Sequence, residues 1–127
     1  MLDEMLAAAR ERLERLDPVQ ARAALDAGAV LVDIRSDDQR ARDGHVPGSV
    51  RVARNVLEWR CAPSSADRDP AVSDPARQVI VMCDAGYQSV LAAATLQDLG
   101  LRRATDLDGG FQAWRAAGLP VTAAGGR

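Results

Sequence analysis

The sequence predicts an α/β fold in which helices cover both faces of a parallel β-sheet. Two short apolar segments, residues 30–34 and 79–82, are rich in β-branched side chains, which is typical of strands buried in a parallel sheet. Segments with helical spacing separate these strands, and such alternation favours parallel pairing. The length of 127 residues fits one domain with a sizeable core.

The N-terminal residues 1–16 are expected to form an amphipathic helix. Apolar side chains recur there at spacings of three, four and seven, opposite arginines and glutamates. This apolar stripe either packs back on the domain or contacts a second copy, and its periodicity does not distinguish the two. Asp17 and Pro18 then fit the N-cap and first position of a second helix, which Gly28 ends.

The middle of the chain carries clear signals for a short helix and a turn. Ser36 and Gln39 form a capping-box pattern, and Gly44 is placed to end that helix. Residues 44–48 then form a turn that leads into a short strand at residues 50–53.

The second half continues the alternation of helices and strands. Residues 62–77 lack periodicity and are rich in Pro, Ser, Asp and Arg, so a solvated loop is expected there. The other expected elements are a helix capped by Asn55 over residues 56–60, a helix that Gly100 closes, a strand at residues 104–107, and a last helix that begins after residues 109–110.

Cys83 stands between the strand at residues 79–82 and the helix-like stretch at residues 90–96. Binding sites of parallel sheets form beyond the carboxyl ends of the strands. Free backbone N–H groups and the dipole at a helix N-terminus stabilise an anion, which favours the nucleophilic thiolate. Gly86 lets the backbone curl so that the N–H groups from Asp84 through Ser89 converge as an anion nest. The Ser89 hydroxyl is expected to donate to the thiolate or to a persulfide.

Three segments, in this order, resemble the rhodanese-like sulfurtransferases. They are residues 32–35 followed by residues 44–48, then residues 79–89, and finally Gly109, Gly110, Phe111 and Trp114 before residues 118–121. The likeness covers roughly residues 18 to 121. It implies a three-layer rhodanese-like fold with a five-stranded parallel sheet flanked by helices on both faces. The implied organisation is an N-terminal helix over residues 1–16, the domain over residues 17–122, and a tail over residues 123–127.

The resemblance also implies a function, which is the movement of sulfane sulfur by a catalytic cysteine. Cys83 would take sulfur from thiosulfate or a persulfide donor, hold it as a persulfide, and pass it to a thiol or cyanide. The expected substrate-binding residues are those of the following loop: Asp84, Ala85, Gly86, Tyr87, Gln88 and Ser89. We expect no cofactor and no metal, because no segment has metal-ligand spacing or a nucleotide-binding glycine pattern.

The charges of this loop differ from those of the corresponding loop in many rhodaneses. Many rhodaneses place an arginine or lysine there, whereas this loop has the neutral Tyr87 and Gln88. Asp84 adds a negative charge beside Cys83, and like charges repel an anionic donor. A persulfide on a small thiol or on a partner protein is therefore an alternative to thiosulfate. If the Asp84 side chain points into water, screening removes most of this effect.

Other functions compatible with the same fold stay open as alternatives. One is a protein-interaction or redox-sensing module without turnover. The others are a phosphatase or an arsenate reductase. Phosphatases of this fold need an arginine six positions after the cysteine to bind the transferring phosphoryl group, and Ser89 occupies that position here.

Residues outside the loop are mostly expected to be structural. His45 lies in a turn where a ring nitrogen usually bonds backbone, and Asp33 and Arg35 are expected to pair at the end of the first strand. Phe111 and Trp114 are expected to pack in the core.

Two further hypotheses concern the surroundings of Cys83. Cys61 is either a chance thiol or a redox partner of Cys83, which the sequence alone does not decide. Arg54, Trp59 and Arg60 are candidates for the rim of the active site, where their positive charge would recruit an anionic donor.

Charge and hydropathy exclude several classes of function. The formal net charge of −2 and the absence of lysine argue against a nucleic-acid or anionic membrane surface and against Schiff-base chemistry. The acidic start of the chain does not fit a signal peptide, and no apolar run approaches the roughly twenty residues of a membrane span. We expect a cytoplasmic enzyme whose partners are a small sulfur donor and a thiol acceptor, with a protein as a further alternative. The oligomeric state stays open.

Overall fold

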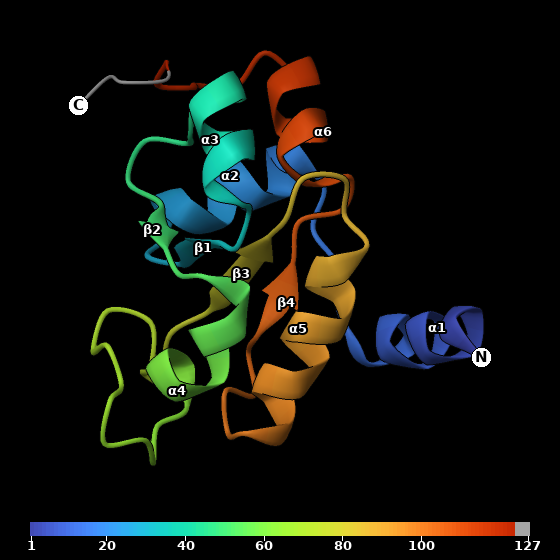
Figure 1. Ribbon diagram of the computed structural model, residues 1–127, viewed down its shortest axis with the longest axis vertical. Helices are drawn as coiled ribbons and strands as arrows, with labels where there is room; N and C mark the ends of the chain where they lie inside the picture. The colour runs from blue at the N-terminus through green and yellow to red at the C-terminus, as the bar shows by residue number, and fades with distance from the viewer. Residues whose placement is uncertain (124–127) are drawn as a thin grey trace.

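The centre of the molecule is a parallel β-sheet (Figure 1). The computed structural model describes residues 1–123, so the predicted tail lies outside the described residues except for Ala123. Within them the strand order is β2-β1-β3-β4, and every strand pair is parallel. The strands are β1 (Val30–Asp33), β2 (Val50–Arg51), β3 (Val79–Met82) and β4 (Thr105–Asp106).

The sheet has four strands among the described residues, rather than the five that the family resemblance implied. The fifth position is filled by one residue, because Leu16 makes a parallel bridge to Leu107 beside β4. The Leu16 N–H donates to the carbonyl of Asp106 (3.1 Å), and the Asp108 N–H donates to the carbonyl of Leu16 (2.8 Å). Pairing stops after one residue because Asp17 already caps the next helix.

Helices cover both faces of this sheet, as expected. Side chains of successive strand residues point to opposite faces. Val30 and Val79 accordingly belong to one buried apolar cluster, whereas Leu31 and Ile80 belong to the other. The first cluster is completed by α1 (Leu2–Arg12), α4 (Leu57–Cys61) and α5 (Gln88–Asp98), and the second by α2 (Pro18–Asp26) and α6 (Gly110–Ala116).

The N-terminal helix is shorter than predicted and packs on the domain. It ends at Arg12 instead of residue 16, because the following segment runs in extended conformation to pair beside β4. Leu6, Ala9 and Leu13 are buried in the cluster shared with α5. This part of the apolar stripe therefore packs on the domain and is not available to contact a second copy. Leu2 and Met5 remain exposed.

The predicted caps are right at two helices and wrong at a third. The side chains of Asp17 and Ser36 each accept the expected N–H at the starts of α2 and α3 (Asp37–Asp43). Asn55 instead lies inside a 3₁₀ turn (Arg54–Val56), and α4 begins after Val56 with no side-chain cap.

Among the described residues, no helix is long and apolar enough to cross a membrane.

Candidate active site

The Cys83 side chain lies at the carboxyl end of β3, just before α5. Its Sγ accepts hydrogen bonds from the Gly86 N–H (3.2 Å) and the Ser89 N–H (3.4 Å). Ser89 is the second residue of α5, so one of these donors belongs to the free N–H groups that begin that helix. Two N–H groups that point at one sulfur would stabilise negative charge on it.

The Ser89 hydroxyl is the third polar neighbour of the sulfur. Its Oγ lies 3.3 Å from Cys83 Sγ, and it donates its proton to Asp106 Oδ2 (2.7 Å). A hydroxyl has one proton to give, so the oxygen faces the sulfur as an acceptor for the thiol proton. This differs from the prediction that the hydroxyl donates to the sulfur, because the sequence did not show Asp106 as a competing acceptor.

Arg15 binds Asp106 and the back of the loop. Its Nε donates to Asp106 Oδ1 (2.8 Å), and its Nη2 donates to Asp106 Oδ2 (3.1 Å) and to the Gly86 carbonyl (2.8 Å). The Asp106 side chain is fully buried, whereas that of Arg15 is 18% exposed. The hydrogen bond to Asp106 raises the pKa of Arg15. Burial opposes this effect, and the negative charges of Asp106, Asp108 and Cys83 add to it.

Sequence reasoning missed both Arg15 and Asp106. Asp106 carried a usable signal, because it lies at the end of a predicted strand and parallel strand ends meet at one sheet edge. Arg15 carried none, because its position matched the helical spacing of residues 1–16.

Two glycines let the loop approach the start of α6. Gly86 has a φ of +88°, and a Cβ there would lie 2.6 Å from the Gly109 nitrogen. Gly110 has a φ of +63°, and a Cβ there would lie 2.5 Å from the Cys83 carbonyl oxygen. The Phe111 N–H donates to that same carbonyl (2.9 Å). The loop after Cys83 and the turn before α6 therefore pack backbone against backbone, with no room for side chains.

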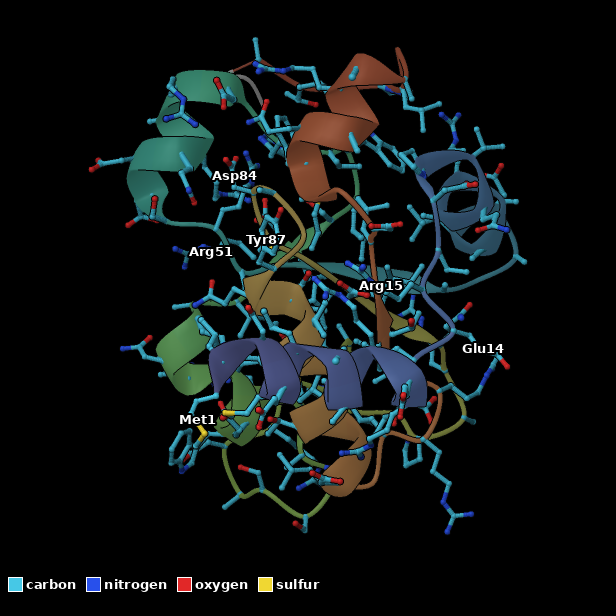
Figure 2. The ribbon with its side chains drawn as sticks, turned by 90° about the vertical axis from the view of Figure 1, so that its right-hand side faces the viewer. Met1, Glu14, Arg15, Arg51, Asp84 and Tyr87 are labelled. Carbon is cyan, nitrogen blue, oxygen red and sulfur yellow. The ribbon has the colours of Figure 1, made fainter. Side chains whose placement is uncertain are left out.

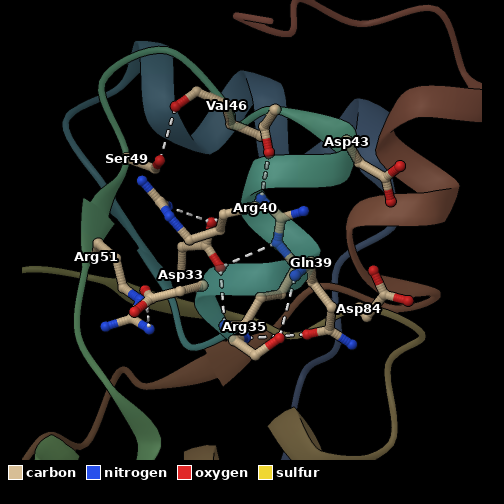
Figure 3. A network of polar contacts seen from close by, with 12 residues as sticks. Asp33, Arg35, Gln39, Arg40, Asp43, Val46, Ser49, Arg51 and Asp84 are labelled. Atoms are coloured by element: carbon tan, nitrogen blue, oxygen red, sulfur yellow. Dashed lines mark hydrogen bonds and ion pairs between the residues drawn. The ribbon is translucent and has the colours of Figure 1, made fainter. Parts of the chain in front are cut away.

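Asp84 is turned toward α3 and α6. Its Oδ1 accepts from Gln112 Nε2 (3.0 Å) and lies 4.0 Å from Arg42 Nη2. Asp43 lies on the same side (Figure 3) and pairs with Arg42 (2.8 Å) and Arg115 (3.2 Å). The Arg42 guanidinium holds the pKa of Asp43 well below its usual range, and Gln112 and Arg115 act in the same direction. Two carboxylates thus face two guanidinium groups, which offsets the charge of Asp84.

The remaining loop residues lie at the surface. Ala85, Tyr87 and Gln88 are exposed, and none of their side chains makes a hydrogen bond within the described residues. Figure 2 shows Asp84 and Tyr87 with Arg51 and Arg15 along the same edge of the sheet. The side chains of these three loop residues are therefore open to solvent.

Asp33, Arg35, Phe111 and Trp114 are structural, as predicted. Asp33 Oδ2 accepts from Arg35 Nη2 (2.9 Å) and from Arg40 Nη1 (2.7 Å), as Figure 3 shows. The buried Arg35 guanidinium stacks on the Phe111 ring at 3.8 Å. Trp114 is buried in the same core cluster as Phe111. His45 pairs with Thr122 through its backbone, and the expected hydrogen bond from its ring to the backbone is not found among the described residues.

Cys61 and Trp59 belong to α4, and among the described residues neither side chain makes a hydrogen bond with the Cys83 loop. Neither cysteine is bonded to the other, and burial raises the pKa of Cys61 to about 12, with smaller contributions from the charges of Asp69 and Glu58. Burial therefore favours the neutral form of the Cys61 thiol, which is a poor nucleophile. Trp59 lines an apolar hollow with Leu99, beyond the opposite end of α5 from Cys83, so it does not rim the site.

The other two candidates for the rim are engaged elsewhere. Arg54 pairs with Glu58 (2.9 Å), and Arg60 donates to the carbonyl of Asp67 (3.1 Å). Neither makes a hydrogen bond or an ion pair with the loop in the described part of the chain.

Comparisons with known proteins identify the family of this chain. The rhodanese-like domain model matches residues 17–117. A curated relative, thiosulfate sulfurtransferase GlpE of Stutzerimonas stutzeri (strain A1501), is 37% identical over 102 residues, covering 80% of this chain and 84% of the relative.

Two solved structures extend the likeness. A Rhodopseudomonas palustris CGA009 protein, described as of unknown function and a possible tyrosine phosphatase, superposes with a TM-score of 0.86 at 36% identity, covering 95% of this chain and 93% of that one. The polysulfide-sulfur transferase homodimer of Wolinella succinogenes superposes with a TM-score of 0.74 at 26% identity, covering 93% and 84%. The motifs, the fold and these matches agree, and the chain belongs to the rhodanese-like domain family.

Proposed function

We propose that this protein is a sulfurtransferase in which Cys83 carries sulfane sulfur. The observation that carries the proposal is the pair of backbone N–H groups, from Gly86 and Ser89, that donate to Cys83 Sγ at the start of α5. A thiolate in such a position is a nucleophile, and the same donors can bind the terminal sulfur of a persulfide. The likeness to thiosulfate sulfurtransferases supports the same reaction.

The reaction has two displacement steps. In the first, the Cys83 thiolate attacks the outer sulfur of thiosulfate, its S–S bond breaks, and sulfite leaves with the bonding electron pair. The enzyme then holds Cys–S–S⁻, with the net charge of the reactants conserved. In the second step, cyanide or a thiolate attacks the outer sulfur of the persulfide, and Cys83 leaves as a thiolate. The products are thiocyanate or a new persulfide, and no redox cofactor takes part.

Thiosulfate and persulfides are both proposed as donors. The sequence left thiosulfate in doubt because of Asp84, but Gln112 and Arg42 now face this carboxylate and offset its charge. The relative from Stutzerimonas stutzeri is a thiosulfate sulfurtransferase, and that from Wolinella succinogenes is a polysulfide-sulfur transferase. Small thiols or a partner protein are the proposed acceptors. The cytoplasm is the proposed compartment, because a free catalytic thiol suits reducing surroundings.

Phosphatase activity is the rival suggested by the Rhodopseudomonas palustris protein. Phosphoryl transfer by this fold needs a guanidinium over the mouth of the loop, and Ser89 stands where the loop would supply it. Arg15 does not replace it, because its donors are bound to the Gly86 carbonyl and to Asp106 behind the loop. We therefore favour sulfur transfer.

Steady-state kinetics test the proposal and separate sulfur transfer from phosphatase activity and from a binding module without turnover. We expect thiocyanate formation from thiosulfate and cyanide with ping-pong kinetics, no thiocyanate formation by Cys83→Ser, and negligible hydrolysis of p-nitrophenyl phosphate. Cys61→Ser is the matched control and should keep the activity. Hydrolysis of the phosphate ester without thiocyanate formation would support the phosphatase. Inactivity toward both substrates and toward glutathione persulfide would support a binding module.

A further inference from the structure

We propose that Arg15 and Asp106 are positioning residues of the sulfur-transfer site, and that Arg15 supplies from behind the loop a positive charge that the loop lacks. The inference rests on the proposed function. Arg15 precedes residues 17–117, the part of the chain that matches the family model. The site is thus completed by the segment that links α1 to the domain.

The pairing of Leu16 with Leu107 brings the two residues together. In a parallel bridge the residues that precede the paired ones lie side by side, so Arg15 falls next to Asp106. The Thr105 hydroxyl donates to the Glu14 carbonyl (2.9 Å), which fixes the same segment one residue earlier. These bonds to β4 therefore set the position of Arg15, which does not depend on a flexible contact at the surface.

Arg15 fixes the orientation of one peptide in the loop. Its Nη2 holds the Gly86 carbonyl at 2.8 Å. The described residues contain no cis peptide bond, and in a trans peptide the N–H points opposite to the carbonyl. The Tyr87 N–H is therefore directed away from Arg15. We assign this N–H to the anion nest, together with the Gly86 N–H that already binds Cys83 Sγ.

Asp106 fixes the Ser89 hydroxyl. By accepting the hydroxyl proton at 2.7 Å, it turns a lone pair of Ser89 toward Cys83 Sγ. The buried carboxylate is itself held by two N–H groups of Arg15, which offset the cost of its burial. Without Arg15, Asp106 would place an uncompensated negative charge one hydroxyl away from the sulfur.

Arg15 and Asp106 have opposite effects on the charge state of the Cys83 sulfur. The positive charge of Arg15 favours the thiolate, whereas the negative charge of Asp106 opposes it. The other charged groups on the elements packed around this site are mostly paired with one another. They are Asp84 with Arg42, Asp43 with Arg42 and Arg115, Asp108 with Arg15, Asp33 with Arg35 and Arg40, and Arg51 with Asp37.

Iodoacetamide alkylation of Cys83 as a function of pH tests the proposal, with Cys61→Ser as the background. Arg15→Gln should move the midpoint of the alkylation rate up by about half a pH unit or more, and Asp106→Asn should move it down by a similar amount. The double variant, which removes both charges, should lie between the two. Arg15→Lys keeps the charge and should stay near the wild type. Loosening of the loop alone would move both single variants the same way.

Arg12→Gln is the matched control, because Arg12 lies in the same N-terminal segment and pairs with Asp98 at the surface. It should leave the midpoint unchanged. Shifts of the same sign in Arg15→Gln and Asp106→Asn, or shifts no larger than in Arg12→Gln, would overturn the proposal. If Arg15→Gln does not fold, Asp106→Asn and Arg15→Lys still decide the outcome, because the first must shift downward and the second must not shift.

Thiocyanate kinetics on the same variants complete the test. Arg15→Gln and Asp106→Asn should each lose about tenfold in kcat/KM for thiosulfate, since both leave the nest or Ser89 misplaced. Activity equal to the wild type in both variants would refute the positioning role. A wild-type protein that forms no thiocyanate and no persulfide would refute the sulfurtransferase function, whereas the alkylation midpoints would still report whether Arg15 acts on Cys83.

Discussion

At the scale of single residues, the sulfur of Cys83 is surrounded by donors from the backbone rather than by charged loop side chains. Gly86 and Ser89 supply N–H groups, and the only loop carboxylate, Asp84, is turned to Gln112 and Arg42. The negative charge that the sequence placed beside the thiolate is therefore largely offset. Such a site depends on the exact course of its backbone more than on the identity of its exposed side chains.

The offset charge of Asp84 makes a measurable prediction. Asp84→Asn should change the KM for thiosulfate by less than about twofold, because Gln112 and Arg42 already face the carboxylate. Arg42→Gln should raise this KM modestly at low salt, and the effect should fade as salt is added. A severalfold fall in KM for Asp84→Asn would show instead that its charge repels the donor.

Cys61 gives a prediction about stability at alkaline pH. Its pKa is raised from the ordinary 9.0 to about 12 by burial, so between these values the folded state keeps a proton that the unfolded state releases. The contribution of the protonated Cys61 thiol to the free energy of unfolding is fully present below pH 9 and is lost as the pH rises toward 12. Urea unfolding should therefore show a steeper alkaline loss of stability in the wild type than in Cys61→Ala. Parallel curves for the two proteins would contradict the assignment.

At the scale of elements, the turn before α6 shapes the catalytic loop. Gly110→Ala should lower kcat/KM at least about tenfold, because the new Cβ meets the Cys83 carbonyl oxygen at 2.5 Å. Gly118→Ala is the matched control. Its φ of +75° gives similar backbone strain, but nothing lies within 4 Å of the added carbon. It should lose about 1 kcal/mol of stability by urea unfolding and keep its kcat/KM. Equal activity losses in both variants would contradict the role of this packing.

The elements also show what the sequence predicted and what it did not. The buried strands, the capped starts of α2 and α3, and the position of Cys83 follow from local patterns of apolar and capping residues. The sequence did not predict where α1 ends, because Leu16 continues the helical spacing although its backbone pairs beside β4. Asn55 failed as a cap because a 3₁₀ turn precedes α4. At the end of α1, local propensity gave way to pairing with a distant segment of the chain.

At the scale of the whole molecule, the site is assembled from segments far apart in the sequence. The loop after β3, Asp106 on β4, the turn before α6 and Arg15 from the N-terminal segment meet at one edge of the sheet. The sequence predicted the loop because its residues are contiguous. It did not predict Arg15, whose place depends on a single bridge beside β4. Long-range pairing of this kind has no signature in local periodicity.

The measurement that tests the central claim most directly is the intact mass of the protein after incubation with thiosulfate, and separately with glutathione persulfide. Sulfur transfer predicts a gain of about 32 mass units, one sulfur atom held as a persulfide. The added mass should map to the peptide that contains Cys83, disappear on addition of cyanide, and be absent from Cys83→Ser. No gain with either donor, or a gain that maps to Cys61, would contradict the account.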